Sequence, residues 1–211
     1  MNQYPVLFIS FKDVEAENFN DALSMLKVRL SEVCIEHSDL KSNSRVNKYD
    51  AETFDELESQ RENQSGVKNS LKTIMRMMHT VYGKKVILLI DEYDVPLARA
   101  NEKDSADNKY YSSMLDVIRG IMSTALKDNE FLEFAVITGC LHIAKESIFT
   151  GTNNFASYSV LDEDFSEYFG FSEDEVKKML SAAGRKETED VIKEWYDGYV
   201  FGDHTVGNSK L

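Results

Sequence analysis

Positive charge is scarce in this chain. Lys and Arg number 24 against 37 Asp and Glu, and the resulting net charge of −13 is spread along the sequence rather than gathered in a tail. Binding of duplex nucleic acid needs basic side chains clustered against the phosphates. The composition therefore argues against a duplex-binding surface, while leaving room for a small local basic site.

Cysteines and long apolar runs are also few. Cys34 and Cys140 are the two cysteines, and both lie in apolar surroundings without metal-ligand spacing, so we expect both to be reduced and buried. No apolar run approaches the length that spans a bilayer, and no charged-then-apolar leader follows Met1. We therefore expect a cytoplasmic protein that makes no membrane contact. No serine or cysteine nucleophile with a convincing base is visible.

The segments that are present alternate between apolar strands and amphipathic helices. A length of 211 residues with 42% hydrophobic content suits one α/β domain with an appendage. Apolar runs predict strands at 4–10, 85–90 and 134–138, and helical periodicity predicts helices at 19–34, 67–81 and 111–125. This alternation is typical of right-handed crossovers and a parallel sheet. We expect a three-layer α/β/α fold.

The strand at 85–90 is the most informative. Its unbroken aliphatic run predicts a strand buried on both faces, and it ends in Asp91 and Glu92. Ligands bind at the carboxyl edge of such sheets. A strand ending in Asp-Glu resembles a Walker B motif, which implies that Asp91 helps to hold Mg²⁺ and that Glu92 polarises the attacking water. The same residues also suit a solvated turn or the N-terminus of a helix.

The pattern changes after Cys140 to turns and short helices. Ser172 followed by Glu175 is a capping box that predicts a helix ending at Gly184, and a second helix is predicted over 187–196. We interpret this region as a small helical lid. The predicted division is an α/β core at 1–145 and a lid at 146–211.

Four motifs in order carry a more specific resemblance. They are ILLIDEYDVPLARA at 87–100, TGCLHIAKESIFTGTNN at 138–154, YFGFSEDEV at 168–176 and EWYDGYVFG at 194–202. Together they resemble the bacterial AAA-ATPase-like family, whose members are often joined to a C-terminal PD-(D/E)XK nuclease-like domain. The resemblance implies a P-loop NTPase sheet with ATP and Mg²⁺ at its edge. It places Thr138 near the sensor position, with His142 and Lys145 as further contacts to the nucleotide.

Three departures from the family pattern matter. No G-x-x-x-x-G-K-[ST] motif occurs, and the glycine spacing of 202–209 has Asn208 in place of the lysine. The family usually has Arg where this chain has His142, so the attraction of that residue for phosphate would be weaker and pH-dependent. A partly exposed histidine at a helix start is the alternative for His142, and a surface ion pair is the alternative for Lys145. The stretch and nuclease-like domain that follow in the family are also absent, so we expect a piece of a longer protein.

Two functional classes follow from these observations. In the first, the longer parent protein binds and hydrolyses ATP and couples closure of the lid to an attached effector, while this chain alone holds no nucleotide. In the second, the fold serves as a scaffold or interaction module without turnover. The family's strand order predicts parallel strands in the order 4–10, 85–90, 134–138. The edge from Phe134 to Thr138 would then be open, covered by the C-terminal region, or paired with a second copy.

Overall fold

The computed structural model describes residues 3–103, 109–140, 156–159, 162–165, 171–185, 191, 198–201 and 204–207. The chain divides into two compact units, Met1–Asn153 and Asn154–Leu211. The predicted division after residue 145 and the role of the second part as a lid stay predictions.

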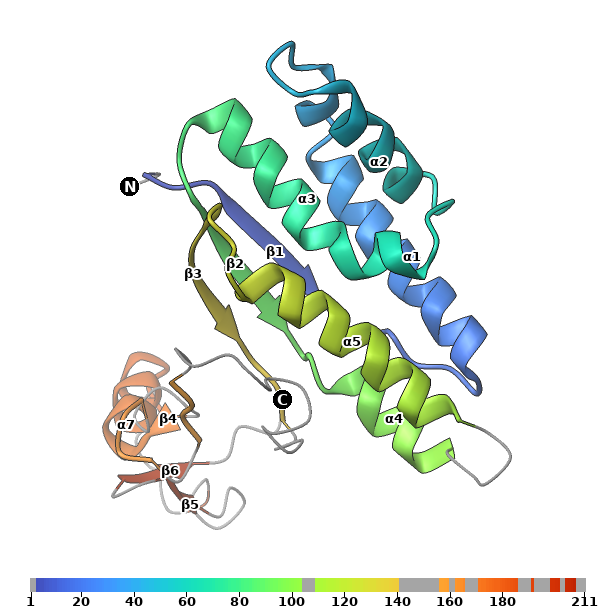
Figure 1. Cartoon of the computed structure of the whole chain (residues 1–211). Helices are drawn as coiled ribbons and strands as arrows, with labels where there is room; N and C mark the ends of the chain where they lie inside the picture. The colour runs from blue at the N-terminus through green and yellow to red at the C-terminus, as the bar shows by residue number, and fades with distance from the viewer. Residues whose placement is uncertain are drawn as a thin grey trace. The chain divides into compact units, whose positions relative to one another are not determined.

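The first unit is built on a parallel three-stranded sheet. Its strands are β1 (Val6–Ser10), β2 (Val86–Asp91) and β3 (Leu132–Ile137), in the order β1-β2-β3 (Figure 1). The register pairs Ser10 with Asp91 and Ile90 with Ile137, so the three strands end at one edge. The predicted strand order and direction are confirmed.

Helices make both connections between the strands. From β1 to β2 the chain runs through α1 (Phe19–Glu36), η1 (Leu40–Ser42), α2 (Lys48–Glu58) and α3 (Gln64–Tyr82), and from β2 to β3 through α4 (Val95–Lys103) and α5 (Tyr110–Leu126). Side chains of Asn18, Asn47 and Asn63 accept hydrogen bonds from the first turns of α1, α2 and α3. Gly83 ends α3 with a φ of +69°. The predicted helices are confirmed.

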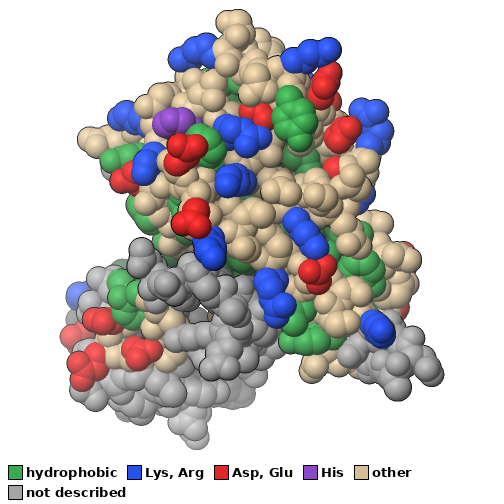
Figure 2. All heavy atoms as spheres, in the orientation of Figure 1, with side chains coloured by type: hydrophobic (Ala, Val, Ile, Leu, Met, Phe, Trp, Pro, Cys, Tyr) green, Lys and Arg blue, Asp and Glu red, His purple; other side chains and the backbone are tan. Residues whose placement is uncertain are grey.

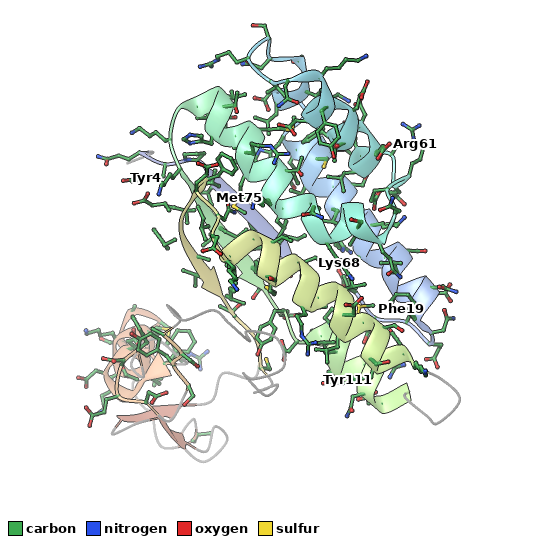
Figure 3. The ribbon with its side chains drawn as sticks, in the orientation of Figure 1. Tyr4, Phe19, Arg61, Lys68, Met75 and Tyr111 are labelled. Atoms are coloured by element: carbon green, nitrogen blue, oxygen red, sulfur yellow. The ribbon has the colours of Figure 1, made fainter. Side chains whose placement is uncertain are left out.

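The core lies between the sheet and one layer of helices. Leu7, Leu88 and Ile90 of the sheet are buried in one apolar cluster with residues of α1, α3 and α5, and these helices lie together on one side of the sheet (Figure 1). Met75 is a buried member of α3 (Figure 3). The side chains on this face of the sheet are buried.

The opposite face of the sheet is apolar but uncovered by the described helices. Val6 and Phe8 on β1 are 44% and 51% exposed, and Phe134 and Val136 on β3 are 51% and 47% exposed. The prediction that β2 is buried on both faces is therefore corrected, because its residues alternate between buried and half-buried. The fold is α/β, with a parallel sheet flanked by helices. The second helical layer of the predicted fold is not among the described residues.

The helical surface of the first unit mixes charges of both signs. Figure 2 shows Lys and Arg interspersed with Asp and Glu, without a patch of one sign on the face in view. Basic side chains bond to acids on neighbouring elements: Arg29 to Asp13 at 2.9 Å, and Lys68 to Asp116 at 2.6 Å. Lys68 lies on α3 where this helix passes α5 (Figure 3). None of the described helices combines the length and apolar character needed to cross a bilayer.

The described part of the second unit holds α7 (Glu173–Ala182) and a small antiparallel sheet. The strands are β4 (Phe171–Ser172), β5 (Gly198–Phe201) and β6 (His204–Gly207), in the order β4-β6-β5. The predicted capping box of Ser172 and Glu175 is confirmed. The sheet was not predicted, although Gly202-Asp203 between two β-rich segments is a hairpin signal. The helix predicted at 187–196 lies almost wholly outside the described residues.

Candidate functional site at the carboxyl edge of the sheet

Asp91 lies at the end of the central strand, between hydroxyl groups from both neighbouring strands. Thr138 Oγ1 donates a hydrogen bond to Asp91 Oδ1 at 2.5 Å, and Ser10 Oγ donates a longer one to Asp91 Oδ2 at 3.5 Å. Because Ser10 ends β1 and Thr138 follows β3, the parallel register brings these three polar groups together. The two hydroxyls orient the carboxylate, which is only partly buried.

Backbone hydrogen bonds extend the sheet past the last strand residues. The N–H of Phe11 donates to the carbonyl of Asp91 at 2.9 Å, and the N–H of Thr138 donates to that of Ile90 at 2.9 Å. The N–H of Tyr93 then donates to the carbonyl of Thr138 at 3.1 Å. The polar end of β2 is therefore fixed to both neighbours by main-chain bonds as well as side-chain bonds.

Glu92 has an unusual backbone conformation. Its φ is +53°, in the left-handed region that non-glycine residues seldom adopt. Such a residue costs on the order of 1–3 kcal/mol and persists where its surroundings dictate it, often at functional sites. Here Asp91 precedes it in the sheet, and its own carbonyl accepts the N–H of Val95 at 3.2 Å. The turn thus redirects the chain from β2 into α4.

Asp94 is a third acid of the turn and is 2% exposed. Its Oδ2 accepts a hydrogen bond from the N–H of Cys140 at 3.0 Å, and its carbonyl accepts those of Leu97 and Ala98 in α4. Burial, followed by the negative charge of Asp94, raises the pKa of the neighbouring Tyr93. Asp94 therefore ties the turn to the segment after β3.

The structure brings three of the five predicted site residues to one place. Asp91 and Thr138 are bonded to each other and Glu92 follows Asp91, whereas His142 and Lys145 lie outside the described residues. Sequence reasoning missed Ser10, whose signal was its position at the end of a neighbouring strand. It also missed Asp94, the last acid of the Asp-Glu-x-Asp run.

The two cysteines differ in environment, which corrects one prediction. Cys34 is buried, and burial raises the pKa of its thiol to about 12. Cys140 was also predicted to be buried, but it is exposed because it lies beyond the end of β3, away from the helix-covered face. Both are free thiols.

The carboxylate and hydroxyl oxygens at the carboxyl edge of the sheet suit a cation such as Mg²⁺ that takes most of its ligands from elsewhere. Mg²⁺ is commonly bound through one or two carboxylates together with waters and substrate phosphates. Asp91 offers one such carboxylate, already oriented by Thr138. Among the described residues no group of three or more metal-ligating side chains gathers. One oriented carboxylate is compatible with a Mg²⁺ ion whose other ligands would be waters and phosphate oxygens.

Comparison with known proteins identifies the family of the chain. The model of a family described as "Predicted AAA-ATPase" matches residues 1–149, which is more than half of the chain and includes all three parallel strands. The chain belongs to this AAA-ATPase-like family. The second unit, Asn154–Leu211, lies entirely outside the matched range.

A curated relative is similar over a shorter stretch. It is described as "Uncharacterized protein in vnfD 5'region", from Azotobacter chroococcum mcd 1, and is 27% identical over 135 residues, or 64% of this chain. The aligned stretch is 25% of the relative, so the chain spans only about a quarter of that protein's length. No solved structure matches the chain. The nuclease-like domain implied by the resemblance stays a prediction.

Proposed function

We propose that this chain carries the Walker B part of an ATP site in a longer AAA-ATPase-like protein. The observation that carries the proposal is the Asp91 carboxylate, which ends the central parallel strand and accepts the Thr138 hydroxyl at 2.5 Å. Carboxyl edges of parallel sheets are where nucleotides bind in open α/β folds. Membership of the family supports ATP as the ligand.

Each residue of the edge has a distinct task in this proposal. A bound Mg²⁺ would neutralise phosphate charge during hydrolysis. Asp91 would hold that cation, and the Thr138 hydroxyl donates a hydrogen bond that orients the carboxylate. Glu92 orients the attacking water and accepts its proton. Glu92 follows Asp91 directly and has a left-handed backbone conformation, with a φ of +53°.

The phosphate contacts require residues other than those described at the edge. The chain has no G-x-x-x-x-G-K-[ST] motif, whose amides and lysine hold the β- and γ-phosphates. In this proposal the longer protein supplies that loop, and His142 and Lys145 add contacts after β3. Closure of the second unit over the nucleotide then drives an attached effector, such as the nuclease-like domain of the family.

The absence of that motif also favours a second candidate. Without a phosphate-binding loop the same fold would act as a scaffold that binds partners and turns over no ATP. The two candidates differ in one measurable property, which is ATP hydrolysis by the longer protein.

The first experiment uses a longer version of the protein that includes the phosphate-binding loop. Glu92→Gln should retain ATP binding and slow hydrolysis by about 10²- to 10⁴-fold, the usual contribution of a general base. Asp91→Asn should instead weaken Mg²⁺-dependent ATP binding. The control is Glu52→Gln, an exposed acid on α2 that should leave both properties unchanged. Equal turnover in Glu92→Gln and the parent would remove Glu92 from the mechanism.

The second experiment uses the 211-residue chain as it stands. Calorimetric titration with Mg-ATP should show no binding tighter than roughly millimolar, because only a few of the contacts of a complete site are present. A micromolar affinity would show that these residues contain a phosphate site of their own. The assignment of the loop to the longer protein would then be wrong.

A further inference from the structure

Two segments that are distant in sequence are joined by hydrogen bonds at the carboxyl edge of the sheet. On one side is the turn after β2, with Asp91, Tyr93 and Asp94, and on the other is the segment after β3. In that segment Thr138 and Cys140 form hydrogen bonds with residues of the turn, and Gly139 between them leaves no room for a side chain against Tyr93 and Asp94. We call this set of six residues, three on each side, the strand-end clamp.

Asp94 supplies the outermost bond of the clamp. Its carboxylate is buried, and Oδ2 lies 3.0 Å from the backbone nitrogen of Cys140. A hydrogen bond from a backbone N–H to an ionised acceptor is about twice as strong as one between neutral groups. Asp94 also begins α4, where its carbonyl accepts two helical N–H groups. One side chain thus connects the start of α4 to the exit of β3.

Gly139 shows how closely the two sides approach. A Cβ atom built at this glycine would lie 2.5 Å from Asp94 Oδ1, and 2.7 Å and 2.8 Å from two ring carbons of Tyr93. Real Cβ atoms essentially never come this close to other heavy atoms, so a side chain at Gly139 would displace the Asp94 carboxylate and the Tyr93 ring. Close backbone approach is a situation that requires glycine.

Thr138 links this contact to the proposed catalytic edge. Its hydroxyl holds Asp91, and its carbonyl accepts the N–H of Tyr93. A shift of the segment after β3 would therefore also move the group that orients Asp91. The hydrogen bonds of Thr138 and Cys140, together with the close approach at Gly139 between them, leave little freedom for either side to move alone.

We propose that Asp94 is a positioning residue, which locks the segment after β3 to the Walker B turn so that both take one fixed geometry around the nucleotide. The inference rests on the proposed function. Asp94 does not contact the reacting atoms in this scheme, since its carboxylate is buried against Cys140. It acts through the segment from Thr138 to Cys140.

The kinetic test compares two substitutions in the longer, ATP-hydrolysing protein. Asp94→Ala removes the acceptor and should lower kcat by about 10- to 100-fold, as loss of orienting partners does, with a smaller change in KM. Asp94→Asn keeps an oxygen that can accept the Cys140 N–H, and should restore kcat to within about threefold of the parent. Equal loss in both variants, or no loss in either, would overturn the proposal.

A matched control separates positioning from stability. Asp50 is also 2% exposed, and it pairs with Arg76 between α2 and α3 instead of at the sheet edge. Asp50→Ala should lower the melting temperature at least as much as Asp94→Ala and leave kcat unchanged at a temperature where both are folded. If Asp50→Ala lowers kcat as much as Asp94→Ala does, the role of Asp94 is merely structural.

The substitution Gly139→Ala tests the same clamp from the other side. Its Cβ should displace the Asp94 carboxylate and the Tyr93 ring, and should lower kcat alone. Because the clash involves Asp94 Oδ1 as well as the Tyr93 ring, the double variant Asp94→Ala with Gly139→Ala should lose less than the product of the single effects. Multiplicative loss would mean that the two residues act independently, against the proposal.

A measurement on the 211-residue chain needs no ATPase activity. The amide of Cys140 should be protected from hydrogen exchange in the parent and in Asp94→Asn, and should exchange at least about tenfold faster in Asp94→Ala. If the longer protein hydrolyses no ATP but this pattern is found, the proposed function fails while the clamp stands as a structural lock. If hydrolysis is found but exchange at Cys140 is the same in all three, Asp94 does not hold this segment.

Discussion

Asp50 and Arg76 form a buried ion pair whose loss should be costly. The Asp50 side chain is 3% exposed, and Arg76 reaches it with two bonds, Nη2 to Oδ1 at 2.5 Å and Nε to Oδ2 at 2.9 Å. Asn47 Nδ2 donates a third bond to Oδ2 at 2.7 Å. The hydrogen bond to Asp50, opposed by burial, is the main cause that raises the pKa of Arg76. Asp50→Ala removes every acceptor of this network.

The magnitude follows from the burial of the two partners. Breaking a buried pair by removing one partner costs about 3–5 kcal/mol, because the other charge is left without compensation. Arg76 is 31% exposed and can recover some hydration, so we expect about 3 kcal/mol, the lower end of that range. In a unit of this size 1 kcal/mol shifts the melting temperature by roughly 2–4 °C. Asp50→Ala should therefore lower it by roughly 6–12 °C.

The assay is urea and thermal unfolding of the 211-residue chain, followed by circular dichroism. The matched control is Glu52→Ala on the same helix, since the Lys48–Glu52 pair is 90% and 62% exposed and should contribute less than about 0.5 kcal/mol. A cycle with Arg76→Met measures the coupling directly. The reasoning is refuted if Asp50→Ala costs no more than Glu52→Ala, or if its effect adds independently to that of Arg76→Met.

Three further predictions test other parts of the fold. Gly83→Ala should cost about 1 kcal/mol by urea unfolding, because φ is +69° and the added Cβ meets nothing within 4 Å; no loss would contradict a purely conformational cost. Burial raises the pKa of Glu62, although Lys27 Nζ, 3.9 Å from Glu62 Oε1, acts in the opposite direction. The folded state thus binds the proton of Glu62 more tightly than the unfolded state does, so the free energy of unfolding should increase as pH falls through the folded pKa toward the unfolded pKa. Glu62→Gln should abolish this increase, and an unchanged pH dependence in the variant would reject the prediction. We also propose that the β3 edge pairs with a second copy, in which case Phe134→Lys with Val136→Lys should reduce the association measured by sedimentation velocity; a parent that is monomeric at every concentration rules this out.

Patterns along the chain predicted the elements that depend on local periodicity. The aliphatic run before Asp91 predicted the central strand, and the alternation of strands with helices predicted that the strands are parallel. The order of the strands was predicted from the resemblance to the family. Ser172 and Glu175 predicted the start of α7, because a capping box is complete within four residues. The central strand and the start of α7 depend on residues that are close together in the sequence, so one sequence is enough to predict them.

Contacts between distant segments were less accessible to sequence reasoning. The pairing of Ser10 with Asp91 depends on the register of two strands 81 residues apart. The bond from Cys140 to Asp94 and the left-handed backbone of Glu92 depend on how closely the turns approach. No propensity marks a glutamate for a positive φ, since glycine and asparagine are the residues that favour it. Such features arise only when the whole edge is assembled.

The uncovered face of the sheet connects these observations to the proposed function. A sheet face that is meant for water carries polar side chains in alternation, whereas Val6 and Phe8 on β1 and Phe134 and Val136 on β3 keep this face apolar. The apolar side chains thus indicate that a second layer packs on this face of the sheet, whereas the described helices cover only the opposite face. The resemblance to the family implies that the phosphate-binding strand lies beside β3. A segment that brought this strand and its helix to the open edge would bury the apolar face and complete the phosphate site in the same step, so nucleotide binding and completion of the fold would be coupled.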